Sequence, residues 1–324
     1  MSQKGPNPWM PRGADYRSRC SAPTRIRGVD QPPQGEPVRP RAGSQTGSPR
    51  VPSELLFVGG ALTQYVGSAL AVLLFARVDA GGVAWLRVLA AAGALAAWRR
   101  PWRGDWTAGR LRLAATFGVV LAAMNLVFYL AIDRLPLGTT VAIEFIGPVT
   151  VAAVGSRTRR DALALALAVL GVALLSGVRL EGSPAGVALA LGAGALWAGY
   201  VVLGHRVAAE RALRPRDGLA VGMLAGAVVL APFLVGTTGP AWSHPALLAA
   251  CLGVGILASV VPYALEQLAM TRLPRARFAL LLALLPASAA LVGAVVLGQV
   301  PGLLELAGIG LVGVAAGLGS HAEP

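Results

Sequence analysis

Long apolar segments follow one another along most of this chain, and they constrain its fold more than any other feature. From about residue 55 onward, Leu, Ala, Val and Gly occupy whole helical turns, so these segments lack the polar face of a surface helix. Each segment has roughly 17 to 23 residues, which is what an α-helix needs to cross a bilayer. With 55% apolar and 13% charged residues, the composition is typical of a membrane protein. The sequence therefore predicts an all-α integral membrane protein.

Ten such segments can be counted, joined mostly by short connections. The predicted spans are approximately residues 55–75, 82–98, 113–132, 138–154, 161–178, 185–205, 219–236, 246–270, 276–297 and 301–319. An even number of spans puts both termini on one side of the membrane.

The basic residues give the expected orientation. Nine Lys and Arg precede the first span, and successive connections carry one, five, one, three, one, four, none, three and none. Because cytoplasmic loops carry the excess of Lys and Arg, this alternation predicts that both termini are cytoplasmic. The net charge of +13 follows from this sidedness, so we expect no nucleic-acid partner.

Residues 1–53 differ in composition from everything that follows them. They are rich in Pro, Gly, Ser and Arg and have no apolar core, so we expect a disordered cytoplasmic tail. They also lack the apolar run of a secretory signal. Two alternatives stay open: a translated tail, or an over-extended reading frame whose true start lies downstream.

Cysteine and histidine indicate no metal or redox chemistry. Cys20 lies in the tail and Cys251 in the eighth predicted span, so no disulfide is expected. His205, His244 and His321 are scattered without ligand spacing. No nucleotide-binding loop occurs either, so we expect no cofactor and no ATP-driven step.

A short motif repeats at a fixed offset. Arg-Leu-Pro occurs at residues 134–136 and again at 272–274, and the same offset of 138 residues carries Pro148 onto Pro286. This agrees with two five-helix halves, which pair span four with span nine. We expect these halves to be residues 54–180 and 181–324. Because five is odd, the halves would be inverted copies, an architecture that permits alternating access to a site near the midplane.

Three polar residues lie within the predicted spans at similar depth. Glu144, Arg87 and Asn125 are each roughly 8–10 Å below the outer surface, where facing lipid would be costly. One interpretation is a static Arg87–Glu144 pair that fixes helix packing. Another is that Glu144 binds a proton when it is desolvated and releases it when a cationic substrate group approaches. A third lets Arg87 extend to the outer interface without Glu144.

Four residues are expected to break the helices. Gly147 and Pro148 follow Glu144, and Pro148 removes the donor for the carbonyl of Glu144 four residues earlier. A freed carbonyl beside a carboxylate can bind an ammonium group, although a simple packing kink is the alternative. Pro262 and Pro286 offer breaks in the second half.

Other polar and aromatic side chains at mid-depth are candidates for lining a substrate path. Glu266 is either a second carboxylate on the path or an interfacial residue near Arg272 and Arg275. Aromatic residues at this depth also serve packing alone. The remaining candidates are Gln64, Tyr65, Ser68, Trp197, Tyr200 and Tyr263.

Several stretches resemble the EamA-type drug/metabolite transporters. They are MNLVFYLAIDRLPLGTTVAIEFIGPVTVA, ALALGAGALWAGYVVLGHRVAAE and PYALEQLAMTRLP. The resemblance implies ten helices in two inverted halves, a bacterial inner (plasma) membrane location, and Glu144, Asn125 and Arg87 as site residues. AIEFIGP is similar to the subgroup that exports threonine and homoserine. Leu285 departs from that subgroup, in which an acidic residue precedes the proline of span nine.

These observations favour a transporter rather than an enzyme. We expect a secondary exporter of small neutral amino acids such as threonine and homoserine, driven by proton exchange. Its expected partners are this small-molecule substrate, protons and the lipid bilayer. The alternatives are another cargo, such as an amphipathic drug or another amino acid, an integral membrane enzyme acting on lipid-linked substrates, and a non-transporting membrane subunit. The sequence leaves monomer and homodimer open.

Overall fold

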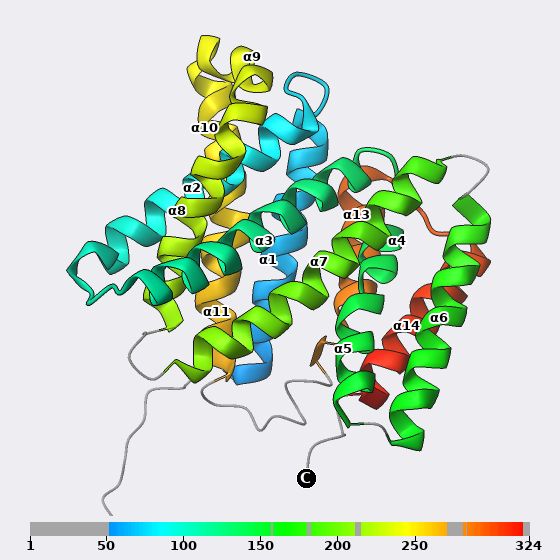
Figure 1. The fold of residues 1–324 in the computed structure, drawn as a ribbon. Helices are drawn as coiled ribbons and strands as arrows, with labels where there is room; N and C mark the ends of the chain where they lie inside the picture. The colour runs from blue at the N-terminus through cyan, green and yellow to red at the C-terminus, as the bar shows by residue number, and fades with distance from the viewer. Residues whose placement is uncertain are drawn as a thin grey trace, which may run out of the picture. The chain divides into compact units, whose positions relative to one another are not determined.

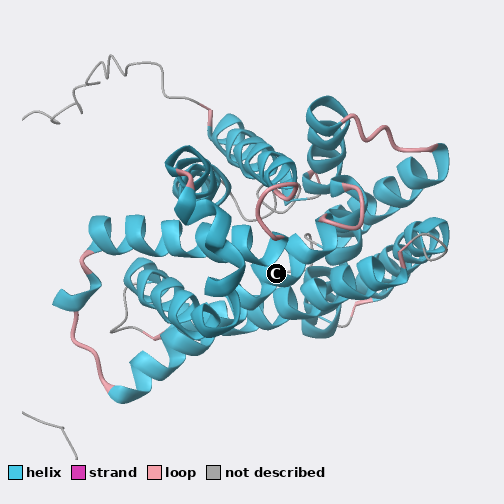
Figure 2. Cartoon of the chain, turned by 90° about the horizontal axis from the view of Figure 1, so that it is seen from above, coloured by secondary structure: helices cyan, strands magenta, loops and turns pink. Residues whose placement is uncertain are grey.

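The computed structural model describes residues 52–156, 158–179, 183–210, 215–270, 281–282 and 284–319. All of them belong to one unit, Arg50–Pro324. The predictions for the tail, Cys20, His321 and the second Arg-Leu-Pro motif lie outside these residues. Within them, the chain forms helices and loops but no strand (Figure 2). The prediction of an all-α fold is therefore confirmed.

The helices follow one another with short connections (Figure 1). In chain order they are α1 Ser53–Leu74, α2 Ala80–Arg99, η1 Pro101–Arg103, α3 Ala108–Ile132, α4 Leu137–Glu144, α5 Ile146–Ser156, α6 Arg159–Arg179, α7 Pro184–Ala209, α8 Pro215–Leu234, η2 Val235–Thr238, α9 Gly239–Ser243, α10 Pro245–Gly255, η3 Ile256–Val260, α11 Val261–Met270, α13 Leu285–Leu297 and α14 Leu303–Gly319.

Local sequence signals explain several helix ends. The Asp79 side chain accepts a hydrogen bond of 2.8 Å from the Gly81 N–H and caps the start of α2. Arg100 takes a left-handed conformation at the end of α2, and Pro101 prevents the helix from continuing. Gly298, with φ of 67°, ends α13 in the same way. These caps fix where each helix leaves the apolar core.

Three of the predicted spans are interrupted. The fourth is divided at Phe145, between α4 and α5. The eighth contains the π-helical turn η3, followed by α11 with Pro262 at its second position. In the ninth, α13 begins at Leu285, with Pro286 in its first turn. Each interruption lies beside a proline that cannot donate a backbone hydrogen bond.

Six described helical segments are long and apolar enough to cross a membrane. They are Ser53–Leu74, Ala80–Arg99, Ala108–Ile132, Pro184–Val207, Asp217–Ser243 and Pro245–Leu265. Leu137–Val151, Leu285–Leu297 and Leu303–Leu318 are apolar but shorter. The prediction of multiple membrane spans is thus supported, whereas ten spans in two repeats remains a prediction.

The packing joins helices that are far apart in the sequence. Helix α1 contacts α11 and α13, α2 contacts α8 and α10, and α3 contacts α7 and α8. Helices α4 and α5 contact α7, and α4 also contacts α13. Helix α6 lies along α14 (Figure 1). Glu144, at the end of α4, consequently lies among helices from both parts of the chain.

Candidate functional site

Glu144 is a buried carboxyl group at a helix break. It is the last residue of α4, and every residue of that helix is buried. Its exposed fraction is 6%. Within the described residues, its side chain forms no hydrogen bond or ion pair. A buried carboxyl group without a partner is costly as a charge, so Glu144 is suited to gain and lose a proton or a cationic ligand.

The backbones of α5 and α7 are in close contact next to this break. A Cβ atom at Gly147 would lie 1.9 Å from the Gly194 carbonyl oxygen, and one at Gly194 would lie 2.7 Å from the Glu144 carbonyl oxygen. Only glycine permits such an approach of α5 to α7. Because Pro148 has no N–H, it cannot donate to the Glu144 carbonyl. The Glu144 carbonyl oxygen instead lies close to the backbone of α7 at Gly194.

Arg87 contacts the π-helical turn instead of a carboxylate. Its Nε donates to the Ser259 hydroxyl at 3.0 Å, and its Nη2 donates to the Ala258 carbonyl at 2.8 Å. Pro262 lies four residues after Ala258 and has no N–H to offer that carbonyl. Arg87 therefore supplies the donor that Pro262 lacks, and it ties α2 to the eighth predicted span.

Tyr129 completes a buried polar cluster around Arg87. The guanidinium lies 5.0 Å from the centre of the Tyr129 ring, a favourable cation–π arrangement. The Tyr129 hydroxyl is buried beside Arg87 and Ser68, and it has no hydrogen-bond partner among the described residues. We call Ser68, Arg87, Tyr129 and Ser259 the polar cluster. Its members come from α1, α2, α3 and η3.

The interpretation that Arg87 and Glu144 form a static ion pair is wrong. The ion pairs among the described residues join Arg99 to Asp217, Arg110 to Glu210 and Arg134 to Asp133. Arg87 is 4% exposed, so it does not extend to the interface either.

The other polar candidates bond mainly within their own helices. The Asn125 amide donates to the Leu121 carbonyl at 2.8 Å, and the Ser68 hydroxyl donates to the Gln64 carbonyl at 3.0 Å. Asn125 and Tyr65 are buried, whereas Gln64 is half-buried. Such bonds satisfy these donors locally and leave the side-chain oxygen of Asn125 as an acceptor.

The aromatic candidates take part in packing. Trp197 meets Phe145, the residue at the α4–α5 break, edge to face with ring centres 5.0 Å apart. Tyr200 stacks on Phe117, also at 5.0 Å. Tyr263 packs against an apolar cluster of α2, α3 and α8. Glu266 lies on α11, and its side chain is outside the described residues.

Sequence reasoning missed Tyr129, Ser259 and Glu305. Tyr129 follows Asn125 by four residues, which places both on one face of α3. Ser259 lies three residues before Pro262, next to the carbonyl that the proline frees. Glu305 is 5% exposed in the first turn of α14. Helical spacing from an intramembrane polar residue or a proline could have found the first two.

Comparison with known proteins decides the family. The profile of the EamA-like transporter family matches residues 184–319. The chain is 38% identical over 257 residues to the threonine/homoserine exporter RhtA of Escherichia coli strain K12, which covers 78% of this chain and 86% of that one. The chain belongs to the EamA-like transporter family. RhtA of Salmonella typhimurium strain LT2 matches with the same identity and coverage. The EamA resemblance read from the sequence is thereby confirmed.

Membership of the EamA-like family gives the buried residues a context. The relatives named above are transporters. This supports the prediction that the chain is a multi-pass protein of the bacterial inner membrane that handles small molecules. In this setting Glu144 and the polar cluster form the candidate site. Among the described residues, His, Cys, Asp and Glu do not gather in any group that could hold a metal ion.

The link between Arg87 and Pro262 gives a stability prediction. Arg87→Ala leaves the buried Ala258 carbonyl without its donor, so we expect a loss of about 1–3 kcal/mol in the free energy of unfolding. Pro262→Ala supplies an N–H four residues after Ala258. The double variant should therefore lose less stability than the two single variants together. Thermal unfolding of the three purified variants measures this, and additive losses would contradict the link.

Proposed function

We propose that this chain exports small neutral amino acids such as threonine and homoserine in exchange for protons. The observation that carries the proposal is Glu144, a carboxyl group buried at a helix break without a partner among the described residues. The names of its relatives support the cargo, because both are threonine/homoserine exporters. The alignment covers 78% of this chain, so it has to span the AIEFIGP segment that contains Glu144.

The proposed coupling uses Glu144 as a shared site. When the carboxyl group is desolvated and empty, the protonated form is favoured. When the ammonium group of an amino acid binds, the charged carboxylate is favoured instead. Protons and amino acid therefore compete for one group, which couples their movements in opposite directions. Arg87 stays engaged with Ala258 and Ser259 and forms no ion pair with Glu144, so it does not occupy the carboxyl group that the ligands would share.

Alternating access follows from the proposed two halves. If the first half is α1 to α6 and the second is α7 to α14, the contact of α1 with α11 has its counterpart in the contact of α7 with α3. The contact of α1 with α13 corresponds in the same way to that of α7 with α4 and α5. Helices α6 and α14 pair with each other. This correspondence supports two related halves that rock about Glu144.

The proposed orientation places both termini in the cytoplasm. The strict alternation of basic residues supports it. On the proposed cytoplasmic side, Arg99 of α2 bonds Asp217 of α8 at 3.1 Å, and Arg110 of α3 lies 3.6 Å from Glu210. These pairs join the two halves at that end. They are partly exposed, so each contributes little stability and can separate during a cycle.

Counterflow in proteoliposomes tests the proposal. Vesicles that contain the purified protein and unlabelled threonine should accumulate labelled threonine from outside, and homoserine should compete. Counterflow needs no proton gradient, so it detects a carrier whatever its coupling. Exchange of other amino acids or of an amphipathic drug, but not of threonine, would reassign the cargo. No exchange of any tested solute by correctly inserted protein would favour a non-transporting subunit.

A further inference from the structure

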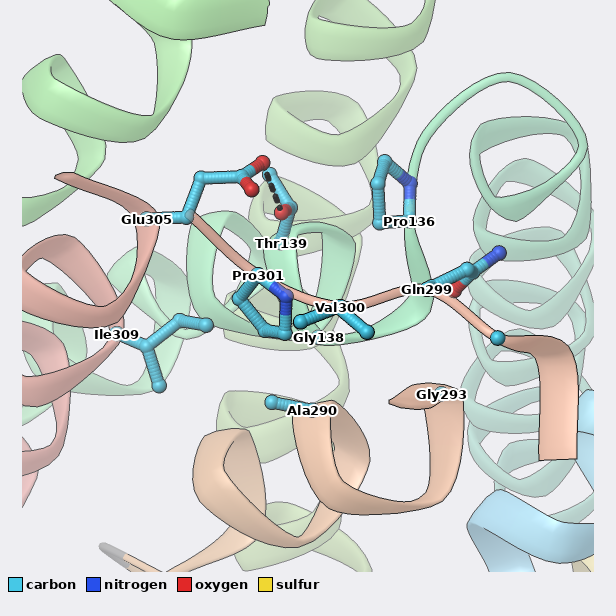
Figure 3. Close-up of a pocket in the computed structure, with 11 residues that line it drawn as sticks. Pro136, Gly138, Thr139, Ala290, Gly293, Gln299, Val300, Pro301, Glu305 and Ile309 are labelled. Carbon is cyan, nitrogen blue, oxygen red and sulfur yellow. Dashed lines mark hydrogen bonds between the residues drawn. The ribbon is translucent and has the colours of Figure 1, made fainter. Parts of the chain in front are cut away.

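A second polar pocket lies away from Glu144, at the opposite end of α4. It has a volume of about 280 Å³. The first turn of α4, the helix α13, the connection 298–302 and the start of α14 enclose it (Figure 3). The lining residues that the argument uses are Gly138, Thr139, Gln299, Val300 and Glu305.

The pocket is lined by one buried acidic side chain. Glu305 is the only charged side chain among the described residues that line it, and its exposed fraction is 5%. The Thr139 hydroxyl donates to its Oε1 at 3.3 Å, and Figure 3 shows the two groups facing each other. Because the hydroxyl donates to Glu305, its lone pairs are available to accept from a ligand. A carboxylate and a hydroxyl together suit an ammonium group.

Helix capping explains only part of this arrangement. Glu305 Oε2 accepts from the Gly302 N–H at 3.0 Å, which caps the start of α14. Asp161 caps α6 in the same way through the Thr158 N–H at 2.9 Å. Asp161 does not line the pocket. The contact of Glu305 with Thr139, on another helix and in a pocket, goes beyond capping.

The position of the pocket connects it to the candidate site. Thr139 precedes Glu144 by five residues on α4, which corresponds to roughly 7 to 8 Å along the helix axis. The start of α4 lies at the proposed outer end of the membrane. Val300 lines the pocket and is 81% exposed, so the pocket opens toward that side. Its volume lies slightly below the roughly 300 Å³ of drug-sized sites, which fits a small metabolite.

We propose that this pocket is a second binding site, in which Glu305 and Thr139 hold the ammonium group of the exported amino acid before release. The inference rests on the proposed function and deepens it. Cargo would pass from Glu144 along α4 to Glu305 on its way out. Gly138 lets α4 pack closely against α13 at the edge of the pocket, because a Cβ there would lie 2.6 Å from the Ala290 Cα.

Charge-selective labelling tests the pocket without transport. Val300→Cys places a thiol at its mouth, and intact cells are treated with a membrane-impermeant cationic or anionic thiol reagent. We expect Glu305 to favour the cationic reagent, and Glu305→Gln to lower the cationic-to-anionic rate ratio about tenfold. Glutamine can still cap α14, so this variant should fold. External threonine should slow the labelling.

Two controls accompany this measurement. The unsubstituted chain should stay unlabelled, because Cys251 is buried and Cys20 is expected in the cytoplasm. Asp161→Asn, combined with Val300→Cys, should leave the rate ratio unchanged because Asp161 caps a helix outside the pocket. An unchanged ratio in Glu305→Gln, labelling only after the cells are permeabilised, or labelling that threonine does not slow would each overturn the proposal. Failure of threonine counterflow by the unsubstituted chain would instead overturn the proposed function.

Discussion

Replacing Glu144 with glutamine should reduce gradient-driven amino-acid export to background while the protein still accumulates in the membrane. Glutamine has nearly the same shape, and it removes the group that would exchange a proton for cargo. It also removes a buried group that is costly to charge, so we expect no loss of stability. The measurement is threonine uptake into inside-out vesicles with an acidic interior, normalised to the amount of protein.

The matched variant for this prediction is Glu144→Asp. Aspartate keeps a carboxyl group but shortens its reach by one methylene, so we expect reduced transport that still responds to the proton gradient. Normal pH-dependent export by Glu144→Gln would refute the coupling role. Loss of both variants from the membrane would instead show that Glu144 is needed for folding.

Gly147→Ala should be the most destabilising of the conservative substitutions near the site. The new Cβ would lie 1.9 Å from the Gly194 carbonyl oxygen, far inside any allowed contact, and both partners are backbone atoms that cannot swing aside. We expect a loss of about 3 kcal/mol or more, with α5 displaced from α7 and transport lost. Thermal unfolding in detergent and membrane abundance measure the effect.

Gly192→Ala provides the comparison on α7. A Cβ at Gly192 would meet only the Val127 Cγ1 at 3.6 Å, an ordinary contact, so this variant should be close to the unsubstituted protein in stability. Equal stability of Gly147→Ala and Gly192→Ala would show that the contact of α5 with α7 is looser than the structure has it.

Local chemistry allowed the break at Glu144 to be predicted from the sequence. Pro148 cannot continue the backbone ladder, so an interruption close to Glu144 follows from that residue alone. The same reasoning located the interruptions near Pro262 and Pro286. It did not predict the lengths of the resulting helices: the fourth and ninth spans leave the shorter apolar helices Leu137–Val151 and Leu285–Leu297, whereas the eighth keeps a segment long enough to cross a membrane, Pro245–Leu265.

The partner of Arg87 could not be predicted in this way. Depth estimates place Arg87 and Glu144 at one level, but they do not say which helices face each other. The actual acceptor, Ala258, lies 171 residues away and is available because Pro262 lacks an N–H. Arg87 therefore donates to the Ala258 carbonyl, which Pro262 leaves without a backbone donor, and not to the carboxylate of Glu144.

The pocket at Glu305 could not be predicted from the sequence either. In sequence, Glu305 looks like an ordinary acidic residue in the first turn of a helix. Its role depends on the connection 298–302, which brings the Gln299 side chain to the Leu137 N–H at 3.0 Å and Glu305 to Thr139. Only the packing of α4 against α13 and α14 brings these residues together.

The most direct test of proton-coupled export is uptake of labelled threonine into inside-out vesicles from cells that express the chain. An acidic vesicle interior should drive saturable uptake that homoserine competes, and collapse of the gradient should abolish it. Saturable uptake that ignores the gradient would contradict coupling through Glu144. No uptake above empty vesicles, with the protein shown to be present, would contradict the export of threonine itself.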